Sequence, residues 1–218
     1  MKIHIYFIPG LAANSKIFEY LTFPKEQFEL YFLEWILPLA ENETISNYAQ
    51  RMAENIKHKK PVLIGVSFGG IIAQEMAKFI DTQKVIIISS IKSNQELPKR
   101  LKLVQITKAY KLFPTKVIEN LEDYTKYFLG DFLKKRANTY KKYLSIRNPL
   151  YLNWAIYNVL HWQQKTPLSK IIHIHGTEDN VFTIKNIKNC IKIKGGTHIM
   201  ILTKSKKILK IILKTLIT

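Results

Sequence analysis

The chain has 218 residues, of which 47% are hydrophobic and 23% charged, and this composition excludes a disordered chain, a collagen or a coiled coil as the main state. The single cysteine, Cys190, excludes an internal disulfide framework and a cysteine-based zinc site. Thirty-four Lys and Arg against 16 Asp and Glu give a net charge of +18, which makes nucleic acid and anionic membranes the partners to weigh.

Short apolar runs alternate with helical patterns in the first part of the chain. Strands are expected at residues 3–8, 28–35, 62–64 and 85–88. Helices are expected at residues 15–21, from Thr44 or Ser46 to about residue 58, and at residues 71–80. This alternation is typical of βαβ units. The sequence therefore predicts an α/β protein with a mostly parallel sheet and helices on both faces.

The later part of the chain begins with a long helical stretch. Residues 92–164 are rich in Lys and Arg and contain no clear strand, so we expect a small helical cap inserted into one domain that spans residues 1–218. A strand at 170–175, a helical turn at 184–189, a strand at 191–193 and a terminal helix at 203–216 follow. No targeting or membrane-spanning pattern is seen, so a cytoplasmic protein is expected.

The chemistry of a parallel sheet is expected in the loops at the carboxyl ends of its strands. The loop after residues 62–64 reads Gly65-Val66-Ser67-Phe68-Gly69-Gly70. A G-x-S-x-G pattern between a buried strand and a helix predicts a nucleophile elbow. In such a turn Ser67 is strained and exposed, and its neighbours Gly65 and Gly69 must be small.

A serine hydroxyl needs a base, and the base needs an acceptor that orients it. His198, in the glycine-rich loop after residues 191–193, is the expected base. Asp179, in the loop after residues 170–175, is the expected acid, with Glu178 as its rival, and His175 is expected to shape the strand end. The order Ser67…Asp179…His198 is typical of this triad. The histidines without an expected catalytic role are His4, His58, His161 and His173.

An oxyanion hole needs two N–H donors. Phe68 follows the nucleophile at a helix start and offers one backbone N–H. The second donor is expected from Leu11, where Gly10 permits a close approach. A simple turn is the alternative interpretation of Pro9-Gly10.

Four segments together resemble the α/β-hydrolase superfamily. They are the strand followed by Pro9-Gly10-Leu11, the loop around Ser67, His175-Gly176-x-x-Asp179, and Gly-Gly-Thr-His198. The chain looks most like small bacterial single-domain serine hydrolases. The resemblance implies the α/β-hydrolase fold with a small cap and a Ser-His-Asp triad. The sequence shows no cofactor or metal motif, so none is expected. Three departures are Pro9-Gly10 in place of His-Gly, Thr183 and Ile184 where a proline is common, and a start at the superfamily's third strand.

The substrate is less well defined than the reaction. The resemblance implies hydrolysis of a small-molecule carboxylic ester or thioester, and a serine argues against the branches that use aspartate. One alternative is an acyl-CoA or acyl-carrier thioesterase whose basic cap attracts an anionic substrate. Another is a non-catalytic binding protein on the same fold. Three aromatic residues line an acyl pocket or pack in the core: Trp154, Tyr157 and Trp162.

No nucleic-acid partner is expected, because lysines are dispersed and only four arginines are present. The terminal helix is amphipathic and basic, but packing on the sheet is favoured over stable membrane association. The oligomeric state is left open.

Overall fold

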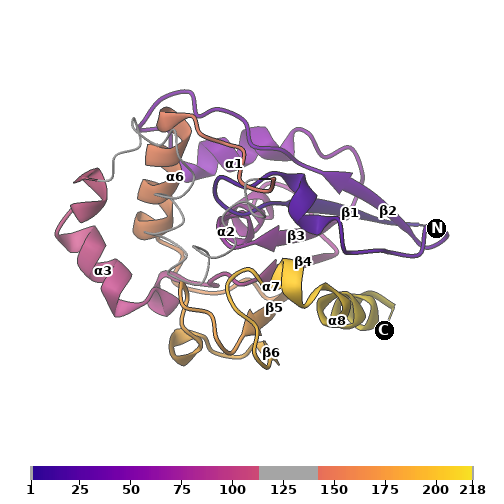
Figure 1. Cartoon of the computed structure of the whole chain (residues 1–218). Helices are drawn as coiled ribbons and strands as arrows, with labels where there is room; N and C mark the ends of the chain where they lie inside the picture. Colours follow the sequence, from indigo (N-terminus) through magenta and orange to yellow (C-terminus); the bar gives the residue numbers. More distant parts are fainter. Residues whose placement is uncertain (1, 113–141, 218) are drawn as a thin grey trace.

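The computed structural model describes residues 2–112 and 142–217 (Figure 1). Six strands form one sheet in the order β2-β1-β3-β4-β5-β6, and every neighbouring pair is parallel. The mostly parallel sheet that the sequence predicts is thus confirmed. The strands are β1 (Ile3–Ile8), β2 (Phe28–Phe32), β3 (Val62–Val66), β4 (Lys84–Ile88), β5 (Ile171–Gly176) and β6 (Ile191–Ile193).

Helices cover both faces of the sheet, and the alternation along β4 shows how. Val85 and Ile87 belong to one buried cluster, while Ile86 and Ile88 belong to the other. The first cluster includes residues of α1 (Ile45–Ala53), α2 (Phe68–Met76) and α6 (Pro149–His161). The second includes residues of the 3-10 helix η1 (Ser15–Phe18), α7 (Met200–Thr203) and α8 (Ser205–Ile217). In Figure 1, α8 accordingly lies across the sheet from α1 and α2.

Helix α1 begins as expected and ends early. Thr44 is its N-cap, because its Oγ1 accepts a hydrogen bond from the backbone N–H of Asn47 at 3.1 Å. The helix ends at Ala53 rather than near residue 58. Beyond it the chain turns toward the sheet, where Nδ1 of His58 lies 2.7 Å from the hydroxyl of Tyr6. This tertiary contact replaces the last predicted turn.

Other element bounds also differ from the prediction. Strand β2 stops at Phe32, three residues early, and η1 is a short 3-10 helix in place of a helix over 15–21. Helix α2 starts at Phe68, directly after the serine, and ends at Met76, so it lies earlier than residues 71–80. The predicted helix over 203–216 is α8, which begins two residues later, and the short helix α7 before it was not expected; Lys204 (φ −128°) leaves the helical region between the two. The turn expected at 184–189 is the 3-10 helix η5 (Ile184–Asn186).

The described part of the predicted cap is helical. It contains the 3-10 helix η2 (Asn94–Glu96), α3 (Lys99–Ile106), the 3-10 helix η3 (Ala109–Leu112) and α6, with no strand among the described residues between β4 and β5. Residues 113–141 lie outside the described residues, so a cap over residues 92–164 stays a prediction. Trp154 and Trp162 are 1% and 3% exposed and pack in the core, whereas Tyr157 is 45% exposed.

Candidate active site

Ser67 occupies a strained turn between β3 and α2. Its backbone has φ 53° and ψ −120°, a region that a non-glycine residue adopts only when its surroundings enforce it. The backbone N–H of Ser67 donates to the carbonyl of Ile88 at 2.9 Å. Its carbonyl accepts from the N–H of Gly70 at 2.9 Å and from Oγ of Ser90 at 2.7 Å. These bonds from the neighbouring strand end and the first helical turn hold the serine in this conformation.

The small residues around Ser67 are required by close backbone contacts. A Cβ atom on Gly65 would lie 2.2 Å from the carbonyl oxygen of Gly69. A Cβ atom on Gly69 would lie 2.2 Å from the carbonyl oxygen of Pro9. At Gly10 the result differs, because a Cβ there would meet Cβ of Ser67 at an ordinary 3.6 Å. Gly10 is thus not required sterically, but it lies directly against the serine.

The structure brings Ser67, His198 and Asp179 into one hydrogen-bonded row. Nε2 of His198 lies 2.9 Å from Oγ of Ser67, and Nδ1 of His198 lies 2.9 Å from Oδ2 of Asp179. A carboxylate only accepts, so Nδ1 carries the proton and Nε2 accepts the serine O–H. The rival acid Glu178 is exposed to solvent. The loops predicted to meet at the strand ends therefore do meet.

The environment of Asp179 favours its charged form. Its side chain is fully buried, and Oδ1 accepts from the backbone N–H groups of Val181 at 2.8 Å and Phe182 at 2.9 Å. Burial alone would raise the pKa of Asp179, but the charge and hydrogen bond of His198, with smaller contributions from His175 and Phe182, lower it below the ordinary value. The carboxylate is therefore ionised at neutral pH and available to His198.

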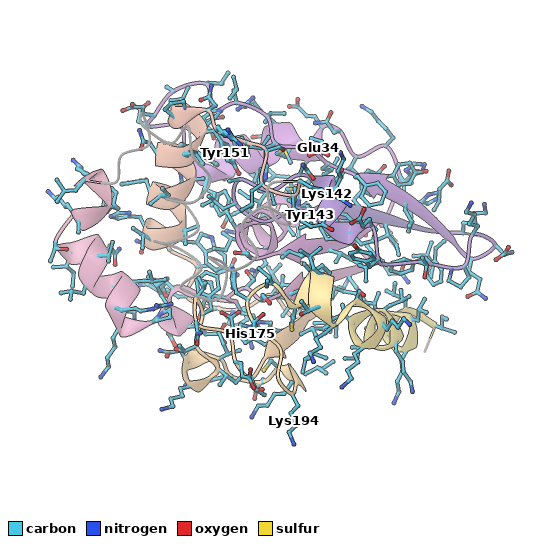
Figure 2. The ribbon with its side chains drawn as sticks, viewed as in Figure 1. Glu34, Lys142, Tyr143, Tyr151, His175 and Lys194 are labelled. Carbon is cyan, nitrogen blue, oxygen red and sulfur yellow. The ribbon has the colours of Figure 1, made fainter. Side chains whose placement is uncertain are left out.

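His175 lies at the carboxyl end of β5 with its side chain fully buried (Figure 2). Its Nε2 lies 2.7 Å from the carbonyl oxygen of Phe182, and its Nδ1 lies 3.0 Å from Nε2 of His173. The bond to Phe182 ties the strand end to the loop that carries Asp179. This position fits the structural role expected for His175.

Two backbone N–H groups, those of Phe68 and Leu11, are the expected oxyanion donors. Phe68 is the first residue of α2, where an N–H has no partner within the helix. The N–H of Leu11 makes no hydrogen bond with any described residue. An oxyanion hole formed by Phe68 and Leu11 stays a prediction.

Sequence reasoning missed Trp35. Its indole Nε1–H donates to the carbonyl oxygen of Gly10 at 3.0 Å, although the sequence shows only an aromatic residue near the end of an apolar run. No motif near Trp35 in the sequence indicates that its side chain forms a hydrogen bond with a loop 25 residues earlier.

Among the residues that the structure describes, no group of three or more His, Cys, Asp or Glu is placed to hold a metal ion. Among the same residues, no helix is long and apolar enough to cross a membrane.

Comparisons with solved structures identify the fold. The chain is similar to a putative non-heme bromoperoxidase, BpoC, from Mycobacterium tuberculosis, with a TM-score of 0.73 and 13% identity over 99% of this chain and 92% of that one. A thermophilic esterase from Thermogutta terrifontis has a TM-score of 0.73 and 12% identity over 99% and 90% of the two chains. An enol-lactonase from Burkholderia xenovorans has a TM-score of 0.68 and 11% identity over 100% and 92%.

At these identities the likeness concerns the fold, and the chain has the α/β-hydrolase fold that the sequence predicts. No protein-family model and no curated protein matches the sequence.

Proposed function

We propose that the protein is a serine hydrolase that cleaves a carboxylic ester or thioester through an acyl-enzyme intermediate. One observation carries the proposal, namely the row from Oγ of Ser67 through the His198 ring to Asp179, with 2.9 Å at each end. A buried carboxylate, an oriented imidazole and a strained serine at a helix start are the parts that acyl transfer to a hydroxyl needs.

The proposed reaction has two halves. Oγ of Ser67 attacks the substrate carbonyl carbon while its proton moves to Nε2 of His198, and the N–H groups of Leu11 and Phe68 stabilise the oxyanion. The intermediate collapses to the acyl-serine, and the leaving alcohol or thiol takes the proton from Nε2. Water then attacks the acyl carbon and gives its proton to Nε2. The acid product leaves as Oγ regains a proton, while Asp179 stabilises each imidazolium.

The fold neighbours support acyl transfer without deciding it. Solved structures with this fold include an esterase and an enol-lactonase, but also a putative bromoperoxidase and an epoxide hydrolase. One fold therefore accommodates several chemistries, and the site residues of this chain must choose among them. Ser67 as the expected nucleophile favours ester or thioester cleavage.

The test is hydrolysis of p-nitrophenyl esters of rising acyl length by the wild type and by Ser67→Ala. We expect a burst of p-nitrophenol that matches the enzyme concentration, followed by slower turnover, because the good leaving group makes acylation faster than deacylation. The alanine variant should show neither phase. Absence of a burst and of turnover with every ester would leave the alternative of a non-catalytic binding protein.

One observation favours an anionic substrate as the finer assignment. The guanidinium of Arg100 in α3 donates to the carbonyl oxygens of Asn180 and Val181, so a cation of the basic insertion lies beside the loop that carries Asp179. A positive field there would raise the encounter rate of anions. The matched pair is mono-p-nitrophenyl glutarate and p-nitrophenyl valerate, compared by kcat/KM at low and high salt. If the two esters have equal kcat/KM values at low and at high salt, the enzyme is an esterase without a preference for anionic substrates.

A further inference from the structure

The carbonyl of Gly10 is fixed from two directions. It accepts the indole N–H of Trp35 at 3.0 Å and the backbone N–H of Ala13 at 3.0 Å. A carbonyl oxygen has two lone pairs, so these two donors occupy both of its hydrogen-bond acceptor positions. This carbonyl and the N–H of Leu11 belong to the same peptide group.

A fixed carbonyl also fixes the direction of that N–H. The described chain has no cis peptide bond, and in a planar trans peptide the C=O and N–H bonds point in opposite directions. The N–H of Leu11 therefore points away from Trp35 and Ala13. Gly10 lies against Ser67, as the 3.6 Å contact of a Cβ added there indicates. The two donors on Gly10 thus set the direction of the Leu11 N–H beside the serine.

Trp35 also contacts the other proposed donor residue. Its ring stacks on the ring of Phe68, with centroids 5.4 Å apart and planes 24° apart. On α6, the ring centroid of Tyr151 lies 5.5 Å from that of the indole. One half-buried side chain therefore joins Gly10-Leu11 to the first residue of α2.

We propose that Trp35 is a positioning residue that holds the Leu11 N–H toward the oxyanion, and this inference rests on the proposed function. Without the indole donor, the Gly10 peptide keeps only the bond from Ala13 and gains freedom to rotate. Rotation would turn the N–H away from the developing charge. Donors that are oriented before the reaction contribute most to stabilising an oxyanion. The indole bond also polarises the shared peptide and so strengthens its N–H as a donor.

Trp154 provides a matched control. Its indole N–H also donates to a backbone carbonyl, that of Glu43, at 2.7 Å, and its ring packs on Tyr48 at 4.1 Å. The side chain of Trp154 is more deeply buried than that of Trp35, and it makes no hydrogen bond with the Gly10-Leu11 loop. A Trp→Phe change at either position removes one indole N–H from the same aromatic cluster.

The experiment compares Trp35→Phe and Trp154→Phe in the full chain, with kcat and KM for a p-nitrophenyl ester and Tm for each protein. For Trp35→Phe we expect kcat to fall about 10-fold with KM within about 2-fold, part of the roughly 10²–10³-fold loss seen when an oxyanion donor is removed. The affinity of a trifluoromethyl ketone, which forms an oxyanion on the serine, should fall by the same factor. Trp154→Phe should change kcat less than about 2-fold, whatever its effect on Tm.

A second replacement separates the hydrogen bond from packing. Benzothienylalanine at position 35 replaces the indole N–H by sulfur with almost no change of shape, and it should reproduce the loss seen with phenylalanine. If this variant retains the wild-type kcat, or if both Trp→Phe variants lose kcat equally, Trp35 does not position the donor. A wild type with no turnover and no covalent adduct on Ser67 would instead refute the proposed function, and the inference with it.

Discussion

Oδ2 of Asp179 is shared by two histidines, because Nε2 of His175 lies 3.5 Å from the same oxygen that Nδ1 of His198 approaches at 2.9 Å. The two rings differ in their exposure to solvent. His198 is 12% exposed at its side chain and reaches Ser67, whereas His175 is completely buried. The difference in burial places the His198 ring at the serine, where the proposed function requires proton transfer, and keeps the His175 ring in the core.

The buried histidines His173 and His175 are neutral in the native protein. Nε2 of His175 donates to the carbonyl of Phe182, so its Nδ1 is the acceptor for Nε2–H of His173. Burial is the main cause that lowers the pKa of both rings. Protonation of His175 at Nδ1 would remove the acceptor of the bond from His173, and protonation of His173 would place a positive charge in the core.

We therefore predict that stability falls as the solution becomes acidic. The native pKa values lie below the ordinary value of 6.5, so between them and pH 6.5 the unfolded chain binds more protons than the native one. Their contribution is fully present above about pH 6.5 and is lost below it, by at most about 1.4 kcal/mol per pH unit for each ring. Urea unfolding at pH 8, 6.5 and 5 measures this slope.

The variant His173→Gln identifies the source of the slope. A glutamine amide can still donate to Nδ1 of His175 but cannot titrate, so the dependence between pH 6.5 and 5 should become shallower. The lowered pKa of Asp179 acts in a separate window, because its contribution is lost only as the pH falls below its ordinary value of 3.8. An unfolding midpoint that is constant from pH 8 to 5 in the wild type would contradict the neutral pair.

The second prediction distinguishes the two neighbouring acids. Asp179→Asn should lower kcat for a p-nitrophenyl ester by about 10³-fold or more, because an amide cannot hold the His198 tautomer or stabilise its imidazolium. Glu178→Gln removes a solvated charge and should leave kcat within about 2-fold. Similar losses in the two variants would show that the acid is assigned wrongly.

The third prediction separates two glycines near the serine. Gly69→Ala puts a Cβ 2.2 Å from the carbonyl oxygen of Pro9, so the backbone must move, at a cost of about 1–3 kcal/mol in the free energy of unfolding. Gly10→Ala makes only ordinary contacts and should fold with nearly wild-type stability, yet its methyl group lies on Ser67 and should lower kcat/KM. Thermal unfolding and ester hydrolysis of both variants test this contrast, and equal Tm values would contradict it.

Much of the sheet can be predicted because its central strands β3 and β4 are almost wholly buried and read as apolar runs. The 85–88 run appears in the structure as β4 with one added residue, and β1 and β6 match residue for residue. The order of Ser67, Asp179 and His198 is also visible in the sequence, since each follows a strand whose end lies at the same edge of the sheet.

Features that depend on tertiary contacts could not be predicted. Helix α1 loses its last expected turn to the contact between His58 and Tyr6, which are 52 residues apart. Trp35 acts on Gly10 through an indole N–H, and nothing in its own neighbourhood indicates that partner. Sequence patterns describe local periodicity and loop chemistry, whereas these features arise from side chains that meet only in the folded chain.

The most direct test of the account is labelling with a fluorophosphonate, followed by intact-protein mass measurement and peptide mapping. The elbow strain and the 2.9 Å contact with His198 predict one adduct per chain, located on Ser67. Labelling should be abolished in Ser67→Ala and strongly slowed in Asp179→Asn. An adduct on another residue, or labelling of Ser67→Ala at the wild-type rate, would contradict the assignment of Ser67 as the nucleophile.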